Sequence, residues 1–173
     1  MKRRGLGTGD WGLGTALLLV ALSAKLSAQE TIGLELGTVG PAAAVQTLEG
    51  QPVDLARYVG KSPVLMEFWA TWCPNCAELE PTMKAMHAKY GDRVAFVGVA
   101  VSINQSPERV KLYVEKHALP WTQVFDRKGN ASGAYDAPAT SYVVVLDKAG
   151  KVVYTGLGGK QDLESAIKKA LGG

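Results

Sequence analysis

The sequence predicts an α/β domain in which helices flank a central mixed β-sheet. Two apolar runs, "PVLMEFWA" at residues 63–70 and "VAFVGVAV" at residues 94–101, suit central strands that are buried on both faces. Helical segments follow both runs, and strands that alternate with helices usually lie parallel. "SYVVVLD" and "KVVYTG", separated by the turn "KAG", add an antiparallel hairpin at the end of the sheet.

The remaining elements follow from local signals. "AAAVQTLEGQPVDL" at residues 42–55 predicts an N-terminal hairpin of two short strands, and "WTQVF" at residues 121–125 predicts another strand before a turn. Cys73-Pro74 begins a helix that ends at Gly91, with Pro81 expected to kink it. Ser106 caps a second helix that runs to residue 117, and residues 162–173 form a closing amphipathic helix.

The first 28 residues have the pattern of a secretory signal peptide. "MKRR" is followed by an apolar run at residues 15–24 and by small residues up to Ala28. We expect cleavage after Ala28, although an uncleaved N-terminal anchor is the alternative. Residues 29–40 read as a Gly-rich linker and residues 41–173 as one domain. The domain would then work outside the cytoplasm, in the periplasm or at the cell-envelope exterior, where thiols meet oxidising conditions.

The net charge of +3 belongs to the leader rather than to the domain. Nineteen Lys and Arg stand against 16 Asp and Glu in the whole chain, and the excess lies in residues 1–28, at Lys2, Arg3, Arg4 and Lys25 against Asp10. The domain is therefore nearly neutral. A nucleic-acid-binding domain would carry a basic patch of its own, so this function class is disfavoured.

Cys73 and Cys76, the two cysteines of the chain, could be metal ligands, a structural disulfide or a redox pair. A closed zinc site needs about four ligands, and His87 and His117 lie far from the pair in the expected fold. A disulfide across two residues closes too small a loop to stabilise the chain much. We therefore expect a redox pair, with no metal and no cofactor.

A C-x-x-C at the start of a helix suits thiol–disulfide exchange. Unpaired N–H groups and the positive end of the helix dipole favour the thiolate of the first cysteine, and the thiolate is the attacking species. Cys73 is the expected nucleophile, and Cys76, buried one turn later, the expected resolving cysteine. Pro74 and Asn75 lie between them, where residues tune the redox poise.

"EFWATWCPNC" resembles the active-site segment of the thioredoxin superfamily, and "GQPVDLARYVGKSPVLMEFWATWCPNCAELEP" resembles its extracytoplasmic TlpA/ResA-like branch, including the DsbE/CcmG type. The resemblance covers roughly residues 41–171. It implies a thioredoxin fold with a central insertion at residues 94–126, and dithiol–disulfide exchange with protein substrates. Many members reduce disulfides outside the cytoplasm, including those of apocytochrome c. We expect a membrane-bound dithiol reductant to regenerate the pair.

The resemblance assigns a role to Glu67, six residues before Cys73. The matching residue in thioredoxin is a buried acid that exchanges the proton of the resolving cysteine. Burial raises a carboxyl pKa and lets it act as a base near neutral pH. The alternative is that Glu67 reaches the sheet edge and is solvated.

Other side chains around the pair have two readings each. By resemblance, Trp72 belongs to an exposed apolar surface that receives the substrate; the alternative is a core aromatic, which we expect of Trp69. Glu78 and Glu80, early in the helix, are expected to lie on its solvated face. His87 and His117 are expected to be surface residues.

The loop "DAPATSY" departs from the family pattern. Thioredoxins have a cis-proline beside the active site, and Pro138, after Ala137, is our candidate for it. A gapless count places Ser141 there instead, and a cis bond before a residue other than proline is costly. Ala137, Pro138 and Ser141 are thus the candidates for the substrate groove, while an ordinary turn proline is the alternative for Pro138.

Together these features predict an extracytoplasmic thiol–disulfide oxidoreductase that acts on protein disulfides. The resemblance implies that it acts as a reductant, whereas the oxidising compartment leaves the role of oxidant open. Two rivals stay open. One is a thiol peroxidase, although Thr71 is only two residues before Cys73 and no Arg is near in sequence. The other is a factor that captures a partner through its thiol and turns over little.

Overall fold

The computed structural model describes residues 32–173. The signal peptide or anchor expected over residues 1–28 lies outside the described residues. The sheet contains the strands β1 (Ala44–Thr47), β2 (Pro52–Asp54), β3 (Val64–Trp69), β4 (Ala95–Val101), β5 (Thr122–Asp126), β6 (Tyr142–Leu146) and β7 (Val152–Leu157). The helices are η1 (Leu55–Arg57, a 3-10 turn), α1 (Pro74–Tyr90), α2 (Pro107–His117), α3 (Asn130–Ala134) and α4 (Leu163–Ala170).

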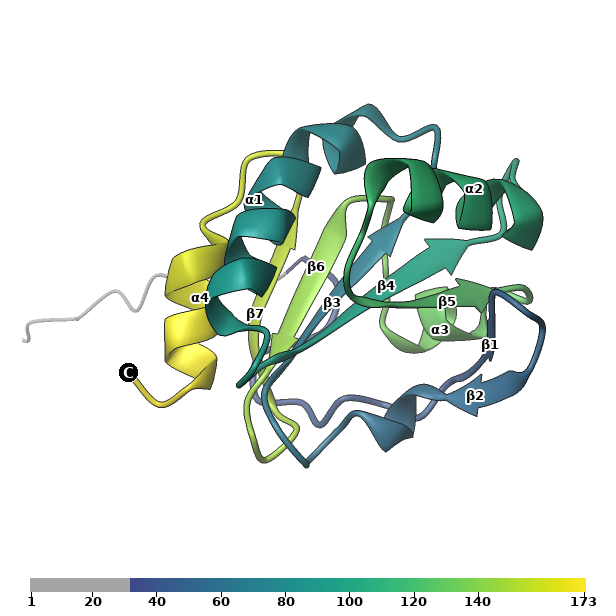
Figure 1. The fold of residues 1–173 in the computed structure, drawn as a ribbon. Coiled ribbons are helices and arrows are strands. Elements are labelled where there is room, and N and C mark those ends of the chain that lie inside the picture. Colours follow the sequence, from purple (N-terminus) through teal and green to yellow (C-terminus); the bar gives the residue numbers. More distant parts are fainter. Residues whose placement is uncertain (1–31) are drawn as a thin grey trace, which may run out of the picture.

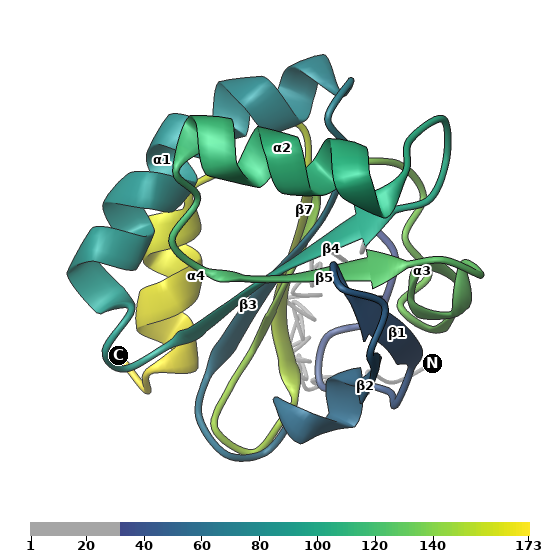
Figure 2. The same ribbon diagram turned by 45° about the vertical axis from the view of Figure 1, so that its right-hand side comes forward.

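The seven strands form one mixed sheet in the order β2-β1-β5-β4-β3-β6-β7. β3 pairs in parallel with β4 and antiparallel with β6, so it lies inside the sheet and all its side chains are buried. The predicted order of strands and long helices is confirmed, while η1 and α3 were not predicted. Pro81 lies inside α1, and Figure 2 shows this helix bending along its length.

Because side chains alternate across a strand, β3 serves two cores. Val64, Met66 and Phe68 pack on one face, which α3 and the N-terminal hairpin cover. Leu65 packs on the other face beneath α1 and α4. Figures 1 and 2 show α1, α2 and α4 together on this second face. Glu67, on the same face as Leu65, therefore points toward the helices.

The described part of the expected linker, residues 32–40, is packed against the domain. Leu34 is buried, and its N–H donates to the Tyr142 hydroxyl at 3.0 Å. Further along, the Gly37 and Gly40 N–H groups donate to the carbonyls of Val152 (2.7 Å) and Gly150 (2.8 Å). This segment thus extends the hydrogen bonding of the β6–β7 hairpin, a role that its glycine-rich sequence did not reveal.

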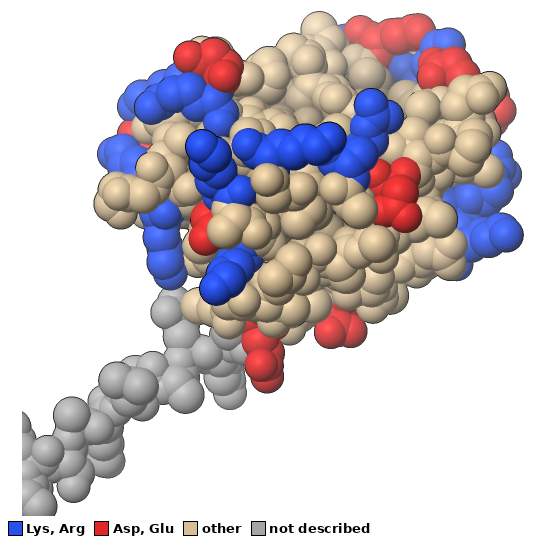
Figure 3. All heavy atoms as spheres, turned by 90° about the horizontal axis from the view of Figure 1, so that it is seen from below, with Lys and Arg blue, Asp and Glu red and all other residues tan. Residues whose placement is uncertain are grey.

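The carboxyl ends of β3 and β4 lie at the same edge of the sheet, where α1 also begins (Figure 1). Figure 3 shows the opposite end of the molecule, where basic side chains extend across the middle of the face with acidic ones between and around them. None of the helices within residues 32–173 is long and apolar enough to cross a membrane.

Candidate active site

Cys73 and Cys76 lie at the first turn of α1 and are joined by a disulfide. Cys73 is the N-cap, with extended backbone, and its Sγ accepts the backbone N–H of Cys76 at 3.1 Å. This N–H would otherwise lack an intrahelical partner. After reduction the same donor and the helix dipole would stabilise a thiolate on Cys73.

The exposed fractions of the two cysteines do not separate their roles, since Cys73 is 5% and Cys76 6% exposed. The residues around each cysteine do distinguish the two roles. Next to Cys73, the Trp72 side chain is 41% exposed and its indole N–H donates to the Ile103 carbonyl at 2.8 Å. Trp72 is therefore a surface residue and not a core aromatic, while Trp69 is buried as expected.

Gln105 holds the loop that precedes the cysteines. Its side-chain carbonyl accepts the Thr71 N–H at 2.9 Å, and its amide donates to the Val101 carbonyl at the end of β4. The loop after β3 is thereby tied to the loop after β4. Pro74 and Asn75 follow on the exposed first turn of α1, where they separate the cysteines as expected.

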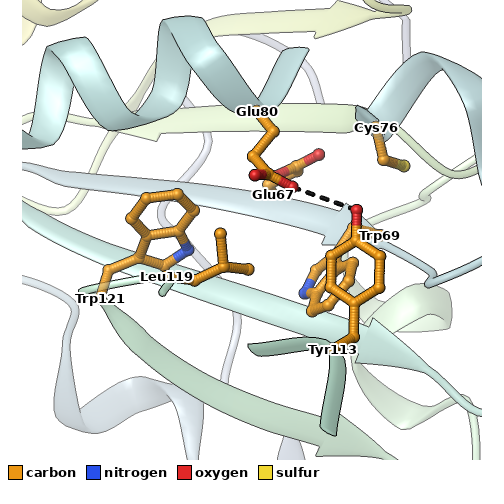
Figure 4. A pocket seen from close by; sticks show the side chains of 7 residues that line it. All are labelled: Glu67, Trp69, Cys76, Glu80, Tyr113, Leu119 and Trp121. Carbon is orange, nitrogen blue, oxygen red and sulfur yellow. Dashed lines mark hydrogen bonds between the residues drawn. The ribbon is translucent and has the colours of Figure 1, made fainter. Parts of the chain in front are cut away.

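Glu67 and Cys76 line the same small cavity, together with Trp69, Glu80, Tyr113, Leu119 and Trp121 (Figure 4). The cavity has a volume of about 10 Å³, which is the lower limit for one water molecule. Glu67 is 5% exposed, and its Oε1 is fully buried without a hydrogen-bond partner. The solvated reading of Glu67 is therefore wrong.

Burial dominates the electrostatics of Glu67. Removal of the carboxyl group from water, followed by the negative charge of Glu80, raises the pKa of Glu67 to about 8. A free cysteine thiol has a pKa of about 8.5. The raised pKa brings the Glu67 carboxyl closer to the range in which thiols exchange protons than the pKa of an ordinary glutamate does.

Glu80 differs from the solvated helix acid that we expected. Its side chain is 15% exposed and accepts hydrogen bonds from Lys84 Nζ at 2.8 Å, Tyr113 Oη at 3.1 Å and His117 Nδ1 at 2.9 Å. Burial raises the pKa of Glu80, but these donors outweigh it, so the pKa lies below its ordinary value. Glu80 is an ionised group at the cavity wall.

Glu78 and the two histidines are more exposed to solvent than Glu67. Glu78 is exposed and pairs with Lys160 at 3.6 Å, as expected. His87 packs edge-on against Phe96, with ring centroids 5.2 Å apart, and His117 stacks on Tyr113 at 3.8 Å. Both histidines are half-buried rather than free surface residues.

The "DAPATSY" loop brings Ser141, and not Pro138, next to β3. The Ser141 N–H donates to the Phe68 carbonyl at 2.8 Å, and the residue is fully buried with φ at 63°. Its hydroxyl donates to the Gly158 carbonyl at 3.0 Å. Pro138 is exposed, and Ala137 packs against the core on the far face of the sheet.

Sequence reasoning missed Gln105 and the partners of Glu80. Two spacings could have indicated that Glu80 has partners. Cys76 and Glu80 are four residues apart in the sequence, and so are Tyr113 and His117. Residues four apart lie on the same face of a helix. Nothing in the sequence indicates that these two faces meet. Within residues 32–173 no group of three or more His, Cys, Asp or Glu is placed to hold a metal ion.

Comparisons with known proteins agree with this geometry. The model of the Redoxin family matches residues 35–171. The Thioredoxin-like protein YneN of Bacillus subtilis is 28% identical over 80% of this chain and 82% of its own length. The Thiol-disulfide oxidoreductase ResA of Bacillus anthracis is 29% identical over 79% of each chain.

Solved structures of thiol-disulfide proteins are also similar to this chain. A thiol:disulfide interchange protein from a Bacteroides species is 27% identical with a TM-score of 0.69, covering 81% of this chain and 92% of that one. The thioredoxin domain of a thiol-disulfide oxidoreductase from Bacteroides vulgatus is 26% identical with a TM-score of 0.68, covering 79% and 97%. These likenesses confirm the expected thioredoxin fold.

Proposed function

The chain belongs to the Redoxin family, within the thioredoxin superfamily, and from this membership we propose that it reduces disulfides of protein substrates outside the cytoplasm. The observation that carries the proposal is the placement of the Cys73–Cys76 disulfide at the N-terminus of α1, with the buried carboxyl of Glu67 in the cavity that Cys76 lines. Relatives named as thiol-disulfide oxidoreductases support the reaction class.

In this reaction the reduced pair transfers two electrons to the substrate. The Cys73 thiolate attacks one sulfur of the substrate disulfide, and the other substrate sulfur leaves as a thiolate. Cys76 then gives its proton to Glu67 and attacks Cys73 Sγ. The Cys73–Cys76 disulfide forms, the mixed disulfide breaks, and the second substrate thiolate is released.

Glu67 serves as the proton acceptor in the resolving step. It faces the Cys76 side of the pair, and its raised pKa, about 8, makes its carboxylate a stronger base than an ordinary glutamate. When an upstream dithiol reduces the disulfide again, Glu67 returns the proton to the Cys76 thiolate. One buried group can therefore act in both half-reactions.

Substrate contact falls to the surface around Cys73. Trp72 offers a large exposed apolar side chain beside the nucleophile. Ser141 is buried against Phe68 and would act on the substrate groove only through the shape of its loop. Apocytochrome c is one protein substrate that the resemblance implies. The leader pattern of residues 1–28 supports an extracytoplasmic location, and a membrane-bound dithiol reductant would regenerate the pair.

Insulin reduction with dithiothreitol as the electron source tests the activity. We expect turnover by the wild type and loss of at least about 100-fold in Cys73→Ser, since the attacking thiolate is gone. Undiminished turnover in that variant would reject the role of Cys73. Peroxide consumption would instead favour a peroxidase, and stable adducts of Cys76→Ser with one partner, without wild-type turnover, would favour a capture factor.

The reduction potential tests the direction of electron flow. A reductant should have a value near that of thioredoxin, about −270 mV, whereas a strong oxidant would lie near about −120 mV. Equilibration with glutathione buffers of known ratio, followed by alkylation of free thiols and mass measurement, gives the number.

A further inference from the structure

Glu80 stands on the wall of the cavity that Glu67 and Cys76 share. It follows Cys76 by four residues on α1, so both side chains lie on one face of the helix. Figure 4 shows its carboxylate extending from α1 toward Glu67. Two acidic groups therefore meet at one small cavity beside the resolving cysteine.

The carboxylate of Glu80 is fixed by donors from two helices. Tyr113 and His117 reach it from α2, and Lys84 reaches it from the next turn of α1. Lys84 Nζ also donates to the His117 carbonyl at 2.6 Å, which closes the network. Because each donor favours the charged form, the negative charge stays in place while its neighbours change protonation.

Few other charges face Glu67. On the strands that flank it, its partners are Gly98 of β4 and Val143 of β6, neither of which titrates. From α2 the Tyr113 phenol faces the cavity, and burial, with the charge of Glu80 next, raises the pKa of Tyr113 to about 12, so it is neutral. Of the described residues that line the cavity, Glu80 alone brings a permanent charge to Glu67.

We propose that Glu80 is a positioning residue for the proton exchange at Cys76: its fixed negative charge makes Glu67 hold its proton more tightly and so sets the pH at which Glu67 accepts the proton of Cys76. This inference rests on the proposed function. A like charge near a buried carboxyl disfavours ionisation of that carboxyl, and it acts strongly where water is excluded. The competing reading is that Glu80 only ties α1 to α2.

Carbon-13 NMR of glutamate carboxyl groups in the oxidised protein tests the inference directly, because the cysteines of the disulfide do not titrate. We expect the Glu67 signal, assigned by its loss in Glu67→Gln, to titrate near pH 8. In Glu80→Gln the midpoint should fall by about one pH unit. In Glu80→Asp, which keeps the charge, it should stay nearer the wild-type value.

Matched variants separate charge from structure. Glu78→Gln removes an exposed acid two residues away on the same helix and should leave the Glu67 midpoint unchanged. Lys84→Met removes the cation beside Glu80 and should move the midpoint upward, opposite to Glu80→Gln. A midpoint that stays at the wild-type value in Glu80→Gln, or in Lys84→Met should Glu80→Gln fail to fold, would overturn the inference.

Stopped-flow reaction of the reduced protein with 5,5′-dithiobis(2-nitrobenzoate) links the titration to the reaction. The first release of thionitrobenzoate reports attack by Cys73, and the second reports resolution by Cys76. We expect the Glu67-dependent midpoint of the second phase to move down in Glu80→Gln. An unmoved midpoint with both phases present rejects the inference alone, whereas a wild type without the two phases rejects the proposed function.

Discussion

Glu67 and Cys76 line one cavity of about 10 Å³, and the Glu67 Oε1 within it has no hydrogen-bond partner. Ionisation of a carboxyl removed from water is costly, and the charge of Glu80 adds to the cost, so Glu67 retains its proton to a pH at which most glutamates are ionised. The pKa of about 8 places that proton within reach of thiol chemistry.

Glu67 should make the oxidised protein less stable as the pH rises. Its pKa is about 8 in the folded protein and about 4.5 in the unfolded chain, so between these values the folded state holds one proton more. The free energy of unfolding then falls by roughly 1 kcal/mol per pH unit over this window. Urea unfolding from pH 4 to pH 9 measures it.

Glu67→Gln is the control for that experiment, because glutamine does not titrate. The unfolding free energy of the wild type, taken relative to that of the variant, should fall steadily from pH 5 to pH 8 and level off above it. Parallel curves for the two proteins would contradict the raised pKa of Glu67.

Trp72 and Trp69, three residues apart, should respond oppositely to replacement by alanine. Trp72→Ala should change stability by less than about 1 kcal/mol, since the side chain is 41% exposed, yet lower kcat/KM for a protein disulfide. Trp69→Ala should cost about 3–5 kcal/mol, because the indole is buried and bonded to Gln123. Equal losses of stability would refute the assignment of Trp72 to the substrate surface.

Ser141 should not accept proline, although a gapless count of the sequence aligns it with the cis-proline of thioredoxins. Its φ is 63°, whereas proline fixes φ near about −65°, and its N–H is bonded to Phe68. We expect Ser141→Pro to cost about 3 kcal/mol or more. Ser141→Gly tolerates positive φ and should cost only about 1 kcal/mol, for the lost hydroxyl bond to Gly158. Thermal unfolding of both variants measures these losses of stability. A stable Ser141→Pro protein would show that the loop can adopt another conformation.

Residues 32–40 should contribute to stability as part of the domain. A chain that begins at residue 41 loses the burial of Leu34 and the backbone hydrogen bonds of Gly37 and Gly40. We expect a loss of at least about 2 kcal/mol relative to a chain that begins at residue 32. Leu34→Ala in the longer chain should reproduce part of this loss. Equal midpoints in urea would mean that the segment behaves as a linker after all.

The sheet and long helices could be predicted because their signals are local. Residues 63–70 and 94–101 are apolar runs that suit buried strands, and Cys73-Pro74 combines a cap with a proline at the first helical turn. Helix α3 was not predicted because its sequence, "NASGA", has no apolar stripe. It depends on Asp126, whose carboxylate accepts the N–H groups of Ala131 and Ser132.

Two features of the site depend on contacts between distant segments. Glu80 looked like a solvated helix acid because its partners, Tyr113 and His117, lie 33 and 37 residues further along the chain. Likewise, the proline pattern favoured Pro138, while the register of β6 against β3 brings Ser141 to the position beside Phe68. Both depend on which faces meet in the fold, and residue types alone do not specify that.

The most direct test of the account is to identify the cysteine that forms the mixed disulfide. Cys76→Ser and Cys73→Ser proteins, each reduced and mixed with a disulfide-containing peptide, are compared by intact mass after alkylation. We predict a stable peptide adduct on Cys73 in Cys76→Ser and at least about tenfold less adduct in Cys73→Ser, because the helix N-terminus favours the Cys73 thiolate. Equal adducts on the two single cysteines, or a preference for Cys76, would contradict the account.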